Sequence, residues 1–203
     1  MARAPNVVTV HPALPVKSVQ DLIALAKARP GQLNYASGGV GSNPHLSGAL
    51  FASMAGINIV HVPYKGGAQA TVDLLGGQVE LSFLGIPSSL PFIKDGKLRG
   101  LAVTGMQRSP ELPGVPTVHE AGLPGYDVNP WYGVLAPAGT PRDIIATLNN
   151  EIARIVRTPE VGRQFTVQGV EAAVTTPEEY AAIIKTDLAK WGKVIRDTGI
   201  RGE

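Results

Sequence analysis

Cysteine is absent from the 203 residues, and no charge of either sign dominates the chain. The lack of cysteine excludes disulfide bonds, thiolate zinc sites and cysteine nucleophiles, and it leaves the cellular compartment undetermined. Lys and Arg number 18 against 16 Asp and Glu, a net charge of +2. Nucleic-acid binding needs a dense basic face, so we predict no nucleic-acid partner. No apolar run approaches the ~18 residues that cross a bilayer, and no secretion signal is recognisable at the start of the chain.

Short β-branched runs alternate with helical stretches from residue 6 to about 105, which predicts a doubly wound α/β unit of mainly parallel strands joined by crossover helices. Glycine (24) and proline (17) are too frequent for a coiled coil or a simple bundle. A capping box over 18–21 is expected to open the first helix, and Gly56 to end the second. The second helix is expected to bury Leu46, Leu50, Phe51 and Met54. We predict strands at 7–10, 32–36, 57–62, 79–83 and 98–104, and helices at 18–29, 42–56, 68–75 and 88–94.

The C-terminal third has a different character. A proline-rich segment at 105–127 predicts an ordered loop with one helical turn at 118–121, and it marks a boundary. A strand at 131–136 follows, and then helices that begin at the Thr-Pro pairs at 140, 158 and 176. Residues 128–203 offer only one or two strands, so this segment is expected to complete another sheet. The last helix, 177–197, carries an apolar stripe made of Tyr180, Ile183, Ile184, Leu188, Trp191, Val194 and Ile195.

A glycine-rich loop over 35–44, between a predicted strand and helix, is the most informative segment. Glycines let the backbone approach a ligand closely, and free amides at the start of a helix favour an anion. The Walker pattern fails because no Lys-Ser or Lys-Thr follows, and the dinucleotide pattern fails because Pro44 stands where the third glycine is required. A tight turn without a ligand is the alternative. The candidate ligand-binding residues of this loop are Ser37, Gly39, Gly41, Ser42 and Asn43.

Acidic residues are missing between Asp21 and Asp73, a span that contains this loop and a second one. An anion pocket needs such a span because a nearby carboxylate would repel the ligand, although chance clustering is an alternative. The second loop follows the strand at 57–62 and offers Tyr64 and Gly66; a third, at 84–89, offers Gly85 and Ser88. The carboxyl ends of parallel strands meet at one sheet edge, so we expect the loops to lie together.

Catalytic arrangements are not recognisable. No Gly-x-Ser-x-Gly sequence is present, and the four histidines lack metal-ligand spacing. His45 and His61 are each expected to hydrogen-bond a nearby backbone group. A pocket of amides, hydroxyls and one phenol holds an anion without reacting with it. We therefore predict no enzyme, no catalytic residue, no metal site and no cofactor.

Several longer strings resemble the Bug family, the substrate-binding proteins of tripartite tricarboxylate transporters. The similarity extends over essentially the whole chain. The strings are Pro5-Asn6-Val7-Val8, Leu14 to Ser18, Lys27 to Ser37, His61 to Gly66, Asp73 to Val79, Pro113 to Thr117, Glu120 to Tyr126 and Leu135 to Pro141.

The resemblance implies a periplasmic receptor of the type II periplasmic-binding-protein class, with two α/β lobes that close on a small carboxylate. Its partners would be this small organic anion and the membrane subunits of the transporter. Carried over to this chain, the family's ligand contacts fall on Ser37, Gly39, Gly41, Ser42, Asn43, Tyr64, Gly66 and the segment from Gly85 to Ser88. Many members have Asp-Asn where this chain has Leu84-Gly85; Leu84 would suit a more hydrophobic carboxylate, or it faces away.

Family members resemble this chain only after an N-terminal stretch that holds the signal sequence and most of the first lobe. The resemblance therefore implies that 6–127 is the ligand-binding lobe (domain 2) and 128–203 an incomplete part of domain 1. Such a cleft is expected to bind weakly, and its exposed helices to self-associate or exchange the C-terminal segment. Two alternatives stay open: an interaction module with a degenerate pocket, and a phosphate-binding α/β enzyme, against which the missing Walker lysine argues.

Overall fold

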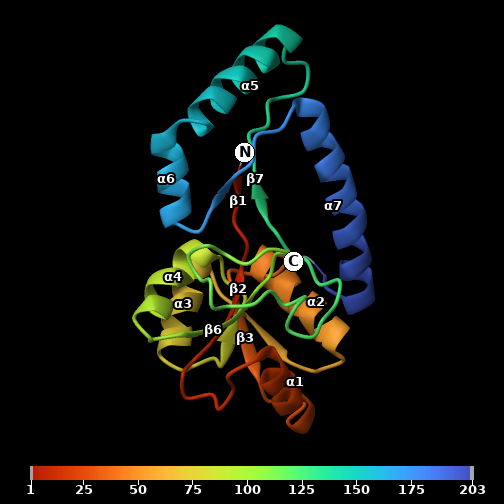
Figure 1. The fold of residues 1–203 in the computed structure, drawn as a ribbon. Coiled ribbons are helices and arrows are strands. Elements are labelled where there is room, and N and C mark those ends of the chain that lie inside the picture. Colours follow the sequence, from red (N-terminus) through yellow and green to blue (C-terminus); the bar gives the residue numbers. More distant parts are fainter. Residues whose placement is uncertain (1, 202–203) are drawn as a thin grey trace.

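A five-stranded sheet lies at the centre of the lower part of the computed structural model, which describes residues 2–201 (Figure 1). Its strands, in spatial order, are β4 (Val60–Pro63), β3 (Asn34–Ser37), β5 (Leu81–Ser82), β2 (Val7–Val10) and β6 (Arg99–Val103). β3 runs parallel to β4 and β5, whereas β2 is antiparallel to both β5 and β6. The prediction of parallel strands is thus wrong for β2. Strand periodicity is the same in both directions, so the sequence of a short buried strand does not show which way it runs.

Helices cover both faces of this sheet, as predicted for a doubly wound unit. α1 (Val19–Ala28) and α2 (Asn43–Ala55) bury Leu22 and Phe51 in the largest core cluster, with Val8 and Val10 of β2. α3 (Gly67–Leu75) and α4 (Ile86–Lys94) contact each other and pack in two further clusters that contain Leu74 and Ile86. Tyr35 and Ala36 are consecutive residues of β3 and belong to different core clusters, because successive side chains of a strand point to opposite faces of the sheet.

Local signals placed most helix ends correctly. The Ser18 hydroxyl accepts from the Asp21 amide at 3.1 Å, but the Asp21 carboxylate accepts from the amide of Lys17 rather than that of Ser18. α2 ends at Gly56, whose φ of 59° is left-handed. The predicted apolar face of α2 is wrong in part. Phe51 is buried, but Met54 is 39% exposed, because small residues around Gly48 form the face that packs on the sheet.

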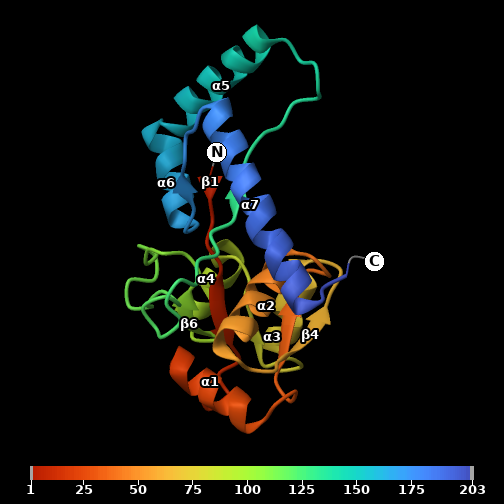
Figure 2. The ribbon, with the colours of Figure 1, turned by 90° about the vertical axis from the view of Figure 1, so that its right-hand side faces the viewer.

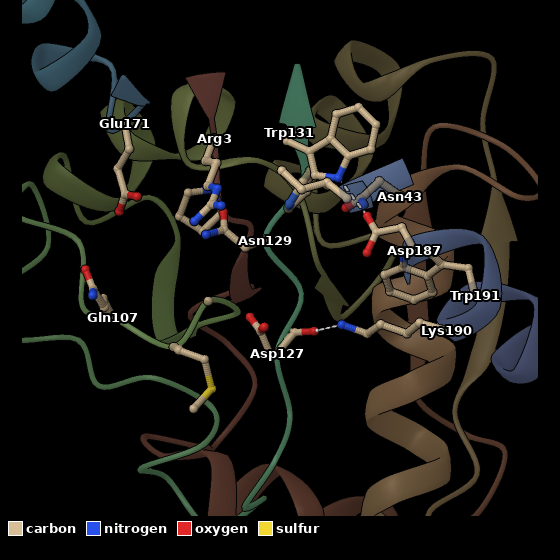
Figure 3. Close-up of a pocket in the computed structure, with 15 residues that line it drawn as sticks. Arg3, Asn43, Gln107, Asp127, Asn129, Trp131, Glu171, Asp187, Lys190 and Trp191 are labelled. Carbon is tan, nitrogen blue, oxygen red and sulfur yellow. Dashed lines mark hydrogen bonds between the residues drawn. The ribbon is translucent and has the colours of Figure 1, made fainter. Parts of the chain in front are cut away.

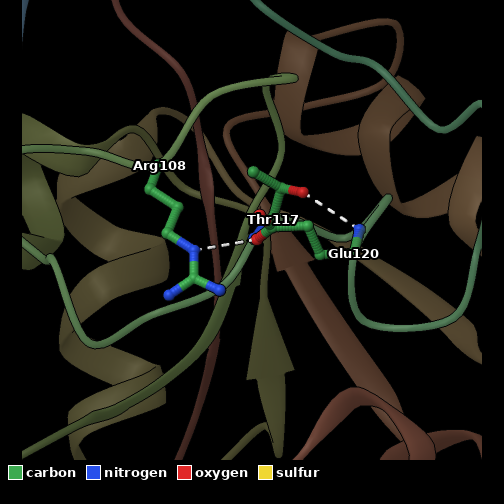
Figure 4. A network of polar contacts seen from close by, with 3 residues as sticks. All are labelled: Arg108, Thr117 and Glu120. Atoms are coloured by element: carbon green, nitrogen blue, oxygen red, sulfur yellow. Dashed lines mark hydrogen bonds and ion pairs between the residues drawn. The ribbon is translucent and has the colours of Figure 1, made fainter.

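The predicted single turn at 118–121 is present inside the long loop (Figure 4). The Thr117 hydroxyl accepts from the Glu120 amide at 3.0 Å, and the Glu120 carboxylate accepts from the Thr117 amide at 2.9 Å. Arg108 donates to the same carboxylate at 2.9 Å. The Thr117 amide and the Arg108 guanidinium together hold the pKa of Glu120 below its usual range.

The upper part of the molecule contains a smaller antiparallel sheet in the order β7-β1-β8 (Figure 1). β7 covers only Trp131–Tyr132 and is shorter than the strand predicted at 131–136. Thr158 and Thr176 cap their helices as predicted, but Thr140 does not, because its hydroxyl donates to the carbonyl of Pro137 and the helix begins after Pro141. The elements are β1 (Ala2–Arg3), β7 (Trp131–Tyr132), α5 (Arg142–Val156), α6 (Pro159–Val167), β8 (Glu171–Ala172) and α7 (Pro177–Thr198).

Helix α7 spans both parts of the molecule (Figure 2). Its C-terminal half contacts α2, and Trp191 packs on the largest core cluster of the lower part. The predicted stripe holds at Tyr180 and Val194, each 8% exposed, but not at Leu188, which is 71% exposed. The division of the chain at residue 127 stays a prediction. Within residues 2–201, no helix combines the length and apolar character needed to cross a membrane.

Candidate functional site

The loop between β3 and α2 is a fixed turn that only glycine allows. Gly39 and Gly41 have φ angles of 130° and 73°, where a side chain would strain the backbone. The Gly39 carbonyl accepts from the Ser42 amide at 3.2 Å and from the Ser42 hydroxyl at 2.7 Å. The sequence therefore places glycines where the turn requires them, and Ser42 closes the turn.

Besides the Ser42 amide, two other amides of the loop already have internal partners. Gly39 N–H donates to the fully buried Ser37 hydroxyl at 3.1 Å, and Gly41 N–H donates to His45 Nδ1 at 3.0 Å. Within residues 2–201, no acceptor takes the amides of Gly38, Val40 or Asn43. These three N–H groups, at the loop and the first position of α2, are the donors that an anion would meet.

Two imidazoles lie stacked behind the loop. The rings of His45 and His61 are parallel within 5° and their centroids are 3.6 Å apart. His45 hydrogen-bonds a backbone group, as predicted, because its Nδ1 accepts from the Gly41 amide. The same prediction is wrong for His61, whose Nε2 lies 2.6 Å from the Ser37 hydroxyl. Burial lowers the pKa of His45; burial and the neighbouring His45 lower the pKa of His61 to about 4. Both rings are therefore neutral at pH 7.

The second loop lies directly against the first. A Cβ atom at Gly38 would lie 3.2 Å from the Gly67 amide nitrogen, and one at Gly39 would lie 3.4 Å from the Tyr64 carbonyl oxygen. Gly66, with a φ of 116°, caps α3. Burial and the nearby Asp73 carboxylate raise the pKa of Tyr64 to about 12, which keeps its phenol neutral. The expectation that these two loops share one sheet edge is confirmed.

The third loop is nearby but closed on itself. The Gly85 carbonyl accepts from the amides of Ser88 and Ser89 and from the exposed Ser88 hydroxyl at 2.9 Å. Leu84 is 3% exposed and belongs to the core beside α3. The suggestion that Leu84 selects a hydrophobic carboxylate is therefore not supported, and the alternative that it faces away fits the structure.

A polar cavity of about 340 Å³ lies between the two parts of the molecule (Figure 3). Asn43 is the one predicted site residue among those that line it. Trp131 Nε1 donates to Asp187 at 2.7 Å, and Lys190 donates to the Asp127 carbonyl. The labelled lining residues are Arg3, Asn43, Gln107, Asp127, Asn129, Trp131, Glu171, Asp187, Lys190 and Trp191.

Sequence reasoning missed the residues that surround Asn43. Arg3 and Asn129 line the cavity, and Asn6 donates to the Asn43 side chain at 2.6 Å. One signal was available for Asn6, since it is a polar residue that directly precedes an apolar strand. Arg3 and Asn129 carry no such signal, because the tertiary fold alone brings them to the cavity. The described part of the chain contains no group of three His, Cys, Asp or Glu side chains that could hold a metal ion.

Comparisons with known proteins agree with this architecture. The family model described as "Tripartite tricarboxylate transporter family receptor" matches residues 1–200. Protein BugT of Bordetella pertussis is 38% identical over 197 residues, which cover 97% of this chain and 60% of BugT. The chain thus spans about 60% of the length of this curated relative.

Two solved structures from Rhodopseudomonas palustris share the fold. Rpa4515, solved with adipate, has a TM-score of 0.92 and 40% identity over 98% of this chain and 67% of its own. MatC, solved with bound malate, has a TM-score of 0.85 and 29% identity over 96% and 67% of the respective chains. Both confirm the expected type II periplasmic-binding-protein fold. A family of solute receptors also agrees with the prediction that the chain is no enzyme. On the family match and these relatives, the chain belongs to the tripartite tricarboxylate transporter receptor family, the Bug or TctC proteins.

Proposed function

We propose that this chain binds a small organic dicarboxylate in the periplasm and presents it to the membrane subunits of a tripartite tricarboxylate transporter. The observation that supports this most is the set of amides of Gly38, Val40 and Asn43, in the loop and at the first position of α2, which have no acceptor within residues 2–201. A carboxylate satisfies such donors and is favoured by the positive end of the helix dipole.

The composition of the two loops and the relatives support an anion, whereas the cavity beside Asn43 is of mixed charge, with Arg3 and Lys190 against Asp127, Glu171 and Asp187. Residues 22–72, which contain both contacting loops, include no Asp or Glu. Two relatives were solved with adipate and malate, which are dicarboxylates. Ser37, Gly39, Gly41 and Ser42 would shape the first loop and Asn43 would donate to the ligand. Tyr64, Gly66, Gly85 and Ser88 would border it from the neighbouring loops.

Titration calorimetry with adipate, malate, inorganic phosphate and ATP tests the proposal. We expect heat from a dicarboxylate and none from ATP. Asn43→Ala is expected to weaken dicarboxylate binding by about tenfold to a hundredfold, because a hydrogen bond to a charged group contributes ~1.5–3 kcal/mol. Ser109→Ala, outside the proposed site, is the control and should bind as the parent does. Binding of phosphate or ATP without any dicarboxylate would refute the proposal.

We also propose that a second copy covers the apolar groove of the upper part. The groove, of about 570 Å³, is lined by residues of α5, α6 and α7 and by the segment after β7. Tyr132, Val134 and Leu135 are 64%, 70% and 72% exposed, and β7 is an edge strand. Exposed apolar surface beside an unpaired strand edge favours association between chains. Light scattering should report a dimer; a monomer at micromolar concentration would refute it.

A further inference from the structure

Asn6 lies in the segment that connects β1 to β2 and is 3% exposed. Its amide donates to the Thr104 hydroxyl at 2.9 Å, and its carbonyl accepts from the Thr104 amide at 2.9 Å. The Thr104 hydroxyl lies 2.6 Å from the carbonyl oxygen of Val128. The backbone of Asn6 is therefore held in place where the chain crosses between the two parts of the molecule.

The side chain of Asn6 reaches the first turn of α2. Its Nδ2 donates to Asn43 Oδ1 at 2.6 Å and to the Ser47 hydroxyl at 3.0 Å. The Ser47 hydroxyl lies 2.8 Å from the backbone carbonyl oxygen of Asn43. Two side chains and one carbonyl of α2 thus form a closed group with Asn6.

The hydrogen inventory of this group determines which way each amide is turned. A carbonyl oxygen only accepts, so the Ser47 hydroxyl gives its one proton to the Asn43 carbonyl. Ser47 then accepts its other hydrogen bond, which Asn6 supplies from its NH2 group. The second N–H of that group requires an oxygen on the Asn43 side chain. Asn43 therefore turns its side-chain Oδ1 toward Asn6. Its side-chain Nδ2 then points away from Asn6, and it has no acceptor within residues 2–201.

We propose that Asn6 is a positioning residue that makes Asn43 a donor toward the ligand. Asn43 lines the cavity and begins α2, directly after the loop in which the amides of Gly38 and Val40 have no acceptor within residues 2–201. With Nδ2 presented, the Asn43 side chain adds a donor at the end of this loop. The group then favours a ligand that only accepts, such as a carboxylate, over one that must donate. This inference rests on the function proposed above.

Asn6→Asp tests the orientation without a ligand. An aspartate carboxylate only accepts, so Asn43 must turn its Nδ2 toward residue 6. In 15N NMR spectra we expect the Asn43 side-chain NH2 to exchange quickly with water in the parent protein and slowly in N6D. Unchanged exchange in a folded N6D protein would overturn the proposal. Ser47→Ala, which removes the restraint with no buried charge, serves if N6D does not fold. It should slow the exchange partly, and no change in S47A would equally refute the idea.

Binding selectivity separates positioning from general structural support. Calorimetry would compare adipate with its diamide, adipamide, in the parent and in Ser47→Ala, which adds no carboxylate that would itself repel adipate. We expect S47A to weaken adipate binding by up to about tenfold, and the ratio of the adipate to the adipamide Kd to rise. A merely structural role would weaken both equally. In an N43A background S47A should cause no further loss; a full additional loss would overturn the proposal. If the parent binds neither compound, the proposed function fails, and the exchange experiment still decides the role of Asn6.

Discussion

Replacing Gly48 by alanine tests the packing between α2 and β3, the two elements that the glycine-rich loop connects. Gly48 lies in the middle of α2, and Cε2 is the atom of the Tyr35 ring that a Cβ at Gly48 would approach most closely. A Cβ atom at Gly48 would lie 2.7 Å from Tyr35 Cδ2 and 2.9 Å from Cζ, closer than real contacts allow. Tyr35 has little room to retreat, since His61 and Phe83 lie at centroid distances of 5.1 and 6.0 Å.

Two opposing free-energy terms decide the result. Alanine stabilises a helix by about 1 kcal/mol relative to glycine. Overpacking a buried position destabilises by about 1–3 kcal/mol, and the upper part of this range applies because the clash involves a ring that is 3% exposed. We expect a net loss of about 1–2 kcal/mol in the free energy of unfolding. For a chain of this length, each kcal/mol lowers Tm by about 2–4 °C.

Urea unfolding followed by circular dichroism measures this difference. Gly162→Ala is the matched control, because Gly162 is also inside a helix and a Cβ there would meet no atom within 4 Å. G162A should gain up to about 1 kcal/mol from helix propensity alone. If G48A is as stable as G162A, the close packing of Tyr35 on α2 is refuted. A second substitution, Tyr35→Leu, should relieve the clash and recover part of the loss.

Three further predictions concern stability. Ser89→Ala should raise the free energy of unfolding by up to about 1 kcal/mol in urea titrations, because the buried Ser89 hydroxyl has no partner within the described residues; a loss would reveal a missed hydrogen bond. Thr176→Ala should lower it by about 1 kcal/mol, since the Glu179 amide loses the Thr176 hydroxyl that accepts from it at the start of α7; an unchanged Tm would contradict this. The pKa of His61 is about 4 in the folded protein against an ordinary 6.5, so the unfolded chain binds the extra proton. Stability should be full above pH 6.5 and fall toward pH 4, as urea midpoints at several pH values would show, and His61→Gln should flatten this slope.

The Asn6 and Ser37 groups show where sequence reasoning reaches its limit. Ser37 was expected to face a ligand, but its hydroxyl is fully buried and holds the loop through Gly39 and His61. Asn6 belongs to a string shared with the Bug family, from which no role follows for its side chain, and it contacts residues 37 and 41 positions away along the chain. The local sequence pattern predicts which backbone turns form. It does not predict which distant group accepts a hydrogen bond from each donor.

The sequence by itself determined most of the local elements and the family. Glycines at Gly39, Gly41 and Gly66 require left-handed φ angles, and the start of α2 provides amides wherever that helix lies. The tertiary structure alone decided that β2 runs antiparallel, that α7 joins both parts, and that Asn6 orients Asn43. The physical reason is the distance along the chain over which each property is decided. Backbone conformation depends on neighbouring residues, whereas strand direction and the partner of a buried polar group depend on packing between segments far apart in the chain.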